Sequence, residues 1–241
     1  MASFPRYFIV ADGSTFHVTW QCHNKDWLLK EDWAKKLYYS LLLKFKSNYG
    51  VRIHSYSFMD NHPHLTGTLS SKEQFSAFFR TVNSLFARAI NKRFKRRGQV
   101  VMDRFKSPRI ETDRHLLEVM IYIDLNPFRA RKVRHPKEYQ FSSYGYYAHG
   151  KEDLLIDPPE TYLALGKTPE ARQKVYREMV EYVIKKDGDR KRNYSNTYFI
   201  GNPYWVVKKH TELKEAFQFK RKPKENRPPP KTQKAPNKSR A

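Results

Sequence analysis

Phe58-Met-Asp-Asn-His-Pro-His-Leu65 joins two segments in which polar and apolar side chains alternate, as they do along half-buried strands. Asp60 and Asn61, at its centre, both tolerate left-handed backbone angles and therefore predict a two-residue turn. We expect antiparallel strands over 51–59 and 62–69 on either side of this turn. The stretch thus predicts a β-hairpin whose second strand begins with a pair of histidines.

His62 and His64 are two residues apart in this stretch. On an extended chain, residues i and i+2 point to the same face, so both imidazoles can reach one point in space. Pro63, between them, has no N–H to donate to a strand ladder, but the first residues of a strand tolerate proline. The pair is a candidate metal site, although a His-x-His sequence is common by chance.

Hydrophobic periodicity on both sides of the hairpin predicts an α+β domain. Phe16 and Val18 alternate with polar residues, which is typical of a strand. Trp33 and Phe45 belong to an amphipathic helical stripe. The order of elements favours a ferredoxin-like or RRM-like fold over residues 6–149, with an antiparallel sheet backed by helices. The expected elements are strands over 15–21, 51–59, 62–69 and 100–111, and helices over 30–47, from Ser71 onward and over 113–126.

The last of these helices carries a second candidate pair. Thr112 can cap the helix, and Pro127 should stop it at about Asn126. Tyr122 and Asn126 are four residues apart and would share one face of the helix. A tyrosine on an apolar helix face is more often part of the core, and asparagine before proline is an ordinary helix stop. We expect this helix to pack against the strand that begins with His62 and His64, which would place Tyr122 and Asn126 beside the two histidines.

The charge of the chain indicates a polyanionic partner. The 241 residues include 47 Lys+Arg against 24 Asp+Glu, which gives a formal net charge of +23 and a pI near 10. Nucleic acid is the first candidate for such a partner, and a merely soluble basic protein is the alternative. Hydrophobic residues make up 39% of the chain, and 16 Phe, 16 Tyr and 4 Trp supply enough bulk for a core.

Basic residues along the long helix and near the ends of the later elements are candidate DNA contacts. A charged helix face is often simply solvated, so their number and their nearness to the expected site favour a phosphate-facing edge. The candidates are Arg80, Arg88, Lys92, Arg93, Lys95, Arg96, Arg97, Arg104, Arg129 and Arg131.

The C-terminal third of the chain divides into two parts. Residues 150–219 predict a mainly helical extension, with one helix over 169–186. Residues 220–241 hold nine Lys/Arg and one Glu, a net charge of +8, and predict a disordered basic arm. We expect this arm to add sequence-independent, salt-sensitive affinity for DNA. Deleting it should reduce the salt dependence of binding and spare cleavage; an unchanged salt slope would contradict this.

Several classes of protein are disfavoured by the sequence. Cys22 is the sole cysteine, which excludes an internal disulfide and a cysteine-based zinc site. The N-terminus lacks the apolar run of a signal peptide, and no stretch approaches the roughly 20 apolar residues of a membrane span. We therefore expect a cytoplasmic protein with no membrane partner.

The two candidate pairs together suggest a reaction at a phosphate. His62, His64 and the Asn126 amide oxygen would form an incomplete shell around a divalent cation, with positions open to water and phosphate oxygens. Such an ion polarises and positions a phosphate. Tyr122 would then be placed as the nucleophile, provided that a nearby cation or base helps its phenol to lose a proton. Because a tyrosine stays bonded to the cleaved strand, this arrangement suits strand transfer better than hydrolysis.

These residues resemble a known family. Met59-Asp-Asn-His-Pro-His-Leu65, followed by Tyr122-Ile-Asp-Leu-Asn-Pro-Phe-Arg-Ala130, is similar to the motifs of the HUH single-tyrosine transposases, and especially of the bacterial REP-associated tyrosine transposases. The resemblance runs from about residue 15 to 147 and includes Gly98-Gln-Val-Val-Met-Asp-Arg-Phe105 and Phe141-Ser-Ser-Tyr144. One departure is Pro63, which replaces the usual aliphatic residue between the histidines and can displace the strand.

The resemblance implies an activity and assigns roles to residues. His62 and His64 would be the HUH histidines, Tyr122 the nucleophile, and Asn126 the third metal ligand. The family cuts single-stranded DNA beside folded hairpins through a 5′-phosphotyrosine, needs Mg²⁺ or Mn²⁺, and usually acts as a homodimer. Two alternatives remain open: a non-catalytic nucleic-acid-binding protein, such as a domesticated relative or an RNA-binding sheet, and a metal-dependent nuclease that uses water.

Overall fold

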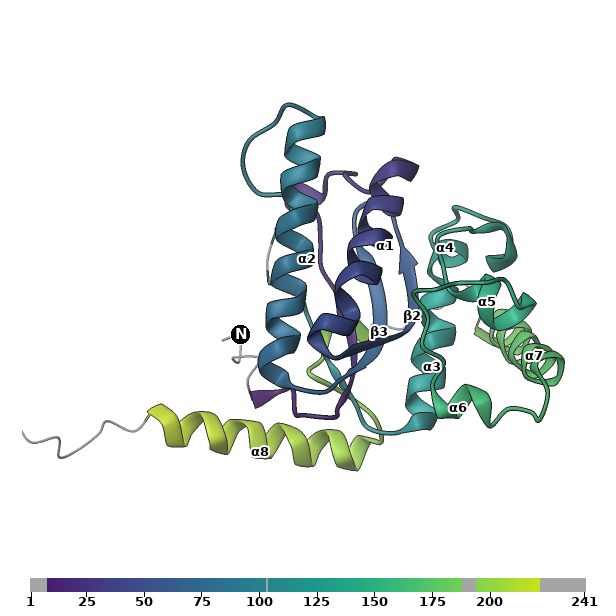
Figure 1. Ribbon diagram of the computed structural model, residues 1–241. Helices are drawn as coiled ribbons and strands as arrows, with labels where there is room; N and C mark the ends of the chain where they lie inside the picture. Colours follow the sequence, from purple (N-terminus) through teal and green to yellow (C-terminus); the bar gives the residue numbers. More distant parts are fainter. Residues whose placement is uncertain (1–7, 103, 188–193, 222–241) are drawn as a thin grey trace, which may run out of the picture.

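The computed structural model describes residues 8–102, 104–187 and 194–221. Five strands in these ranges form one sheet in the order β2-β3-β1-β4-β5 (Figure 1). The first four pair antiparallel, and β5 runs parallel to β4. This α+β arrangement confirms the predicted fold class. The strands are β1 (Thr15–Thr19), β2 (Val51–Phe58), β3 (Pro63–Leu69), β4 (Arg109–Ile110) and β5 (Phe199–Ile200).

The helices lie on both sides of the sheet (Figure 1). α1 and α2 pack against each other and cover one face, and α3 packs against β2 and β3 on the other. None of the helices in the described ranges is both long and apolar enough to cross a membrane. The helices are α1 (Asp32–Lys46), α2 (Lys72–Arg93), α3 (Asp113–Asp124), α4 (Asn126–Arg129), α5 (Tyr144–His149), α6 (Glu160–Leu163), α7 (Pro169–Asp187) and α8 (Pro203–Arg221).

Strand alternation gives the two faces of the sheet opposite character. On the α1–α2 face, the Phe16 ring lies 4.5 Å from the ring of Phe75 in α2, within an extensive apolar core. On the α3 face the β1–β3 register, which pairs His17 with Thr66, brings polar side chains together. Most of these polar residues are buried. The buried ones are His17, Thr19, Ser55, Ser57, His64 and Thr66.

The hairpin forms as the sequence predicts. The Met59 amide donates to the His62 carbonyl at 3.0 Å and closes the Asp-Asn turn. Pro63 opposes Phe58 at the first position of β3 and does not displace the strand. The Phe58 amide donates to the Phe141 carbonyl at 2.9 Å and not across the hairpin. The Phe58–Pro63 pair therefore needs no hydrogen bond from the proline nitrogen.

Two predicted elements differ from the structure. Among the described residues of the expected strand over 100–111, only Arg109–Ile110 form a strand, and Val101 and Lys106 form isolated bridges. Pro108 lies in this segment and cannot donate to a ladder, which limits the pairing. The expected helix over 113–126 ends at Asp124, and Pro127 lies in the first turn of the short helix α4 instead of ending α3.

The C-terminal segments cover the outer side of α3 and the far edge of the sheet. The Asp124 carboxylate, fully buried, accepts hydrogen bonds from Ser143 and from Tyr176 of α7, both at 2.7 Å. β5 adds a strand beyond β4, and the Phe199 side chain packs in a small cluster with Ile9 and with Leu213 of α8. The helix predicted over 169–186 is confirmed as α7, whereas most of the predicted basic arm lies outside the described residues.

Gly67 in β3 gives a first testable prediction. A Cβ at this position would lie 2.1 Å from the Arg52 carbonyl oxygen and 2.8 Å from the Phe16 ring. Neither backbone nor core can yield easily, so Gly67→Ala should lower the free energy of unfolding by roughly 1–3 kcal/mol or more in urea titrations. Gly145→Ala is the control, because its Cβ would meet only the flexible Lys151 side chain. Equal stability of the two variants would contradict this packing argument.

Candidate active site

The structure brings three of the predicted site residues together beneath α3. The rings of His62 and His64 lie 4.8 Å apart, and the ring of His64 lies 5.9 Å from that of Tyr122. His64 and Tyr122 are 3% and 8% exposed, so the three side chains meet at the edge of the interior. The hairpin positions the imidazoles and the last turn of α3 positions the phenol, as the two motifs predict.

Both imidazoles are held through the same ring nitrogen. Nδ1 of His62 lies 2.6 Å from Oδ1 of Asn61, and Nδ1 of His64 lies 3.0 Å from Nε2 of His17. Histidines that bind metals commonly have one nitrogen fixed by such a partner, which sets the tautomer and the ring orientation. The arrangement leaves Nε2 of each histidine as the candidate ligand atom.

The electrostatics of the site favour neutral imidazoles. Burial lowers the pKa of His62 to about 4, although Asp60 acts against this shift. Burial also takes the pKa of His64 well below its usual value, and repulsion from its histidine neighbours adds to the effect. A neutral imidazole keeps a lone pair at neutral pH, as metal coordination requires.

His17, on β1, is a member of the site that motif reasoning missed. It is fully buried, its ring stacks on that of His64 at 5.3 Å and 14°, and it meets the Tyr122 ring edge-on at 6.1 Å. Burial lowers its pKa to about 4, against a smaller opposing effect of the Tyr194 backbone. Its place on the polar side of an alternating strand was visible in the sequence, but its pairing with His64 depends on the strand register.

Asn126 lies at the start of α4 rather than in the last turn of α3. Its side-chain nitrogen donates to the carbonyls of Tyr122 at 3.2 Å and Ile123 at 3.4 Å, which orients the amide. The described ranges contain no cluster of three His, Cys, Asp or Glu side chains suited to a metal ion. A third protein ligand beside His62 and His64 would therefore have to be a group such as the Asn126 amide oxygen.

Two further side chains contact the Tyr122 ring. The Arg129 guanidinium lies 5.6 Å from the centre of the Tyr122 ring and is buried, unlike the other candidate DNA contacts. Tyr194, from the C-terminal segment, packs edge-on against the Tyr122 ring at 5.0 Å. Arg129 is thus placed as a partner of the phenol, whereas the sequence suggests a surface contact.

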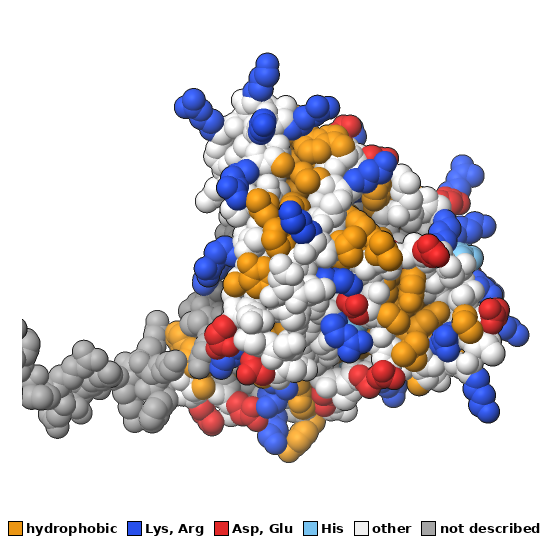
Figure 2. Space-filling view, in the orientation of Figure 1, with side chains coloured by type: hydrophobic (Ala, Val, Ile, Leu, Met, Phe, Trp, Pro, Cys, Tyr) orange, Lys and Arg blue, Asp and Glu red, His pale blue; other side chains and the backbone are white. Residues whose placement is uncertain are grey.

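The remaining basic candidates lie at or near the surface, several of them at the end of α2 and in the loop after it. Figure 2 shows Lys and Arg side chains projecting around that end of the molecule. Arg80 and Arg104 line a cavity of about 410 Å³ between α2 and residues 98–101 and 104–105. Arg131 lines another, of about 530 Å³, after α4. The exposed or partly exposed candidates are Arg80, Arg88, Lys92, Arg93, Lys95, Arg96, Arg97, Arg104 and Arg131.

Comparisons with known proteins identify a related family and a shared fold. Residues 11–124 match the family described as IS200-like transposases. A solved structure of a REP-associated tyrosine transposase bound to a REP hairpin shares the fold, with a TM-score of 0.53 and 20% sequence identity over 66% of this chain and 93% of the other. No curated protein sequence matches the chain.

Proposed function

Because residues 11–124 belong to the family of IS200-like transposases, we propose that this protein cleaves and rejoins single-stranded DNA beside hairpins. The proposed intermediate is a 5′-phosphotyrosine at Tyr122. One observation carries the proposal: the hairpin and the end of α3, about sixty residues apart in the chain, bring the phenol and two neutral imidazoles to one place.

In the proposed reaction, the Tyr122 oxygen loses its proton and attacks a backbone phosphorus, and the bond from phosphorus to O3′ breaks. The upstream strand leaves with a free 3′-hydroxyl, and the downstream strand stays bonded to Tyr122 through its 5′-phosphate. The phosphodiester energy is then kept in the bond to the protein, so a second strand end can reverse the step. The Arg129 guanidinium places a positive charge beside the ring that would carry negative charge. Its burial makes that charge less screened than one at the surface.

Mg²⁺ or Mn²⁺ is the proposed cofactor, and when bound it would polarise and position the scissile phosphate. The donor types suit such an ion: His62 and His64 would offer Nε2, and Asn126 its amide oxygen. His17 and Asn61 would hold the imidazoles, each by its Nδ1. The homodimer that the family resemblance implies stays a prediction.

Two alternatives differ from this proposal in the product. A nuclease that uses water would release cut DNA with no protein attached, and a non-catalytic binder would release nothing. The position of the phenol at the imidazole pair favours strand transfer over both. Hairpin-bearing single-stranded DNA, incubated with the protein and Mn²⁺, should therefore form an adduct that survives boiling in detergent.

The metal dependence provides the internal control. EDTA should abolish the adduct while leaving the electrostatic part of DNA binding in place, because the basic surface does not depend on the ion. Free cleaved DNA without adduct would support the water-using nuclease. Binding that is unaffected by EDTA, with no cleavage, would support the non-catalytic protein.

A further inference from the structure

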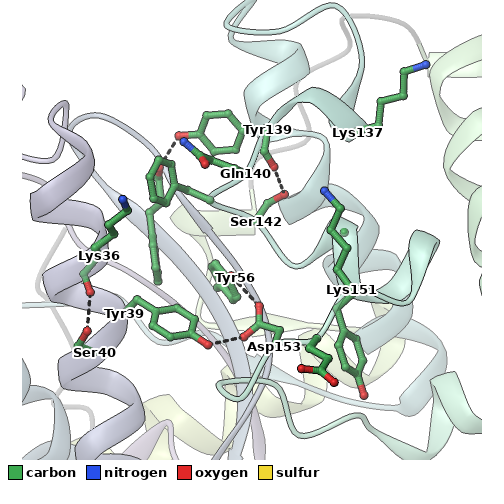
Figure 3. Close-up of a pocket in the computed structure, with 15 residues that line it drawn as sticks. Lys36, Tyr39, Ser40, Tyr56, Lys137, Tyr139, Gln140, Ser142, Lys151 and Asp153 are labelled. Atoms are coloured by element: carbon green, nitrogen blue, oxygen red, sulfur yellow. Dashed lines mark hydrogen bonds between the residues drawn. The ribbon is translucent and has the colours of Figure 1, made fainter.

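A cavity of about 560 Å³ lies beside the edge strand β2 (Figure 3), and neither His62 nor His64 lines it. One wall is α1, the floor includes Tyr56 and Phe58 of β2, and the other wall is the segment 137–153. Its volume is within the usual range for small-ligand sites. The function proposed above makes no use of it.

Aromatic rings dominate this cavity. Tyr39, Tyr139, Phe141 and Tyr146 are each partly exposed and line it. Tyr139 and Phe141 meet edge to face at 72°, with ring centres 6.3 Å apart, and the Lys35 ammonium lies 5.2 Å from the centre of the Phe141 ring. Partly exposed rings of this kind are what unpaired bases stack on, because every base has a π-face.

Asp153, which lines the cavity, already has its hydrogen-bond partners. The Asp153 carboxylate accepts a hydrogen bond from Tyr39 and another from Tyr56, each at 2.7 Å, and a third from the Leu155 amide at 3.1 Å (Figure 3). Burial, together with this carboxylate, raises the pKa of Tyr39 to about 12. The phenols therefore remain neutral donors, and Asp153 is committed to holding them.

The rim of the cavity is positively charged. Lys36, Lys137 and Lys151 are exposed and line it, and in the described part of the chain none of the three forms an ion pair. Lysines of this kind suit the phosphates of a nucleotide. Glu152 is the one further acid of the lining, so the rim keeps a positive excess.

A chain of contacts connects the cavity to the candidate active site. Lys132 forms an ion pair with Asp60, in the turn just before His62, and its ammonium lies 6.0 Å from the centre of the Tyr139 ring. The Tyr139 hydroxyl donates to the Phe58 carbonyl at 2.6 Å, at the end of β2. The segment that walls the cavity is thus tied to the hairpin that carries the histidines.

We propose that this cavity, the β2-edge pocket, binds an unpaired nucleotide of the DNA strand, with the base against the aromatic rings and the phosphate at the lysines. The inference rests on the proposed DNA substrate. It adds a place where single-stranded sequence next to a hairpin is held, and it separates that contact from the cleavage chemistry.

The test compares three forms of one hairpin oligonucleotide by fluorescence anisotropy: with an unpaired flank of mixed sequence, with an abasic flank, and without a flank. Wild type should bind the first form at least about fivefold more tightly than the second, since stacking accounts for the difference. Lys36→Ala should weaken binding to the flanked form, and Ser40→Trp, which fills the pocket from an exposed position of α1, should remove the preference for bases.

Lys44→Ala is the matched control, because it removes the same charge from an exposed position of the same helix outside the pocket. Equal losses for Lys36→Ala and Lys44→Ala, with a base preference that persists in Ser40→Trp, would overturn the inference. Lys151→Ala repeats the Lys36 test from the opposite wall and does not depend on α1.

The outcome is independent of strand transfer. Base-dependent binding that the pocket variants remove, without any Tyr122 adduct, would support the pocket and refute the proposed chemistry. An adduct formed equally well by wild type and Ser40→Trp, with no base preference in either, would support the chemistry and refute the pocket.

Discussion

Tyr122→Phe is expected to lower adduct formation with hairpin-bearing single-stranded DNA by about a thousandfold or more, because the proposed nucleophile is lost. The phenyl ring should fit the same space, since the Tyr122 ring is 8% exposed and a phenylalanine can keep its edge-on packing against His17 and His64. The variant should therefore keep its fold and its DNA affinity. Denaturing gel electrophoresis of labelled DNA with Mn²⁺ measures the adduct, and anisotropy measures binding.

Tyr194→Phe is the matched control for that variant. Its ring packs edge-on against the Tyr122 ring, and removing its hydroxyl changes the same surroundings by one oxygen atom. We expect its adduct to remain within a few-fold of wild type. An undiminished adduct from Tyr122→Phe would contradict the proposed chemistry. Loss of the adduct only in Tyr194→Phe would identify Tyr194 as the nucleophile.

The parts of the fold that depend on local patterns could be predicted from the sequence. The Asp60-Asn61 turn fixes the hairpin, and the hairpin fixes which face His62 and His64 share. Thr112 caps α3 as predicted, so the rotation of Tyr122 on that helix also follows from sequence. Two local signals were therefore enough to suggest that an imidazole pair and a phenol could meet.

The parts that depend on long-range pairing could not be predicted in this way. His17 contacts His64 because β1 pairs with β3 in one particular register, and alternation along β1 defines only the face of the sheet. β5 is two residues long and pairs with β4 from nearly ninety residues away, which no local pattern can indicate. Tyr194 reaches Tyr122 through that same C-terminal segment.

Arg129 illustrates a different reason for the mismatch. In the sequence it belongs to a run of basic residues after Pro127, and such a run usually indicates an exposed surface. The short helix α4 turns this one residue inward, where its NH1 donates to the Tyr122 carbonyl at 3.5 Å and its guanidinium lies against the Tyr122 ring. A run of basic residues predicts a charged surface, but it cannot show which residue of the run a short helix turns into the interior.

The second large effect is expected at His17. If a metal ion binds Nε2 of His64, then Nδ1 of His64 carries the proton and donates it to Nε2 of His17. His17→Ala would leave this donor buried without an acceptor and free the His64 ring to rotate. We expect the affinity for Mn²⁺, measured by titration calorimetry without DNA, to fall about 10–100-fold.

His17→Gln should restore part of that affinity, because its amide oxygen can accept the same hydrogen bond. His54→Ala controls for the loss of a buried histidine: His54 is 2% exposed in β2 and its Nδ1 pairs with the Asp157 carbonyl, away from the candidate ligands. That variant should lose stability and keep its Mn²⁺ affinity. Equal Mn²⁺ affinity in wild type and His17→Ala would mean that His64 needs no support from β1. The buried contact between His17 and His64 would then contribute to packing alone.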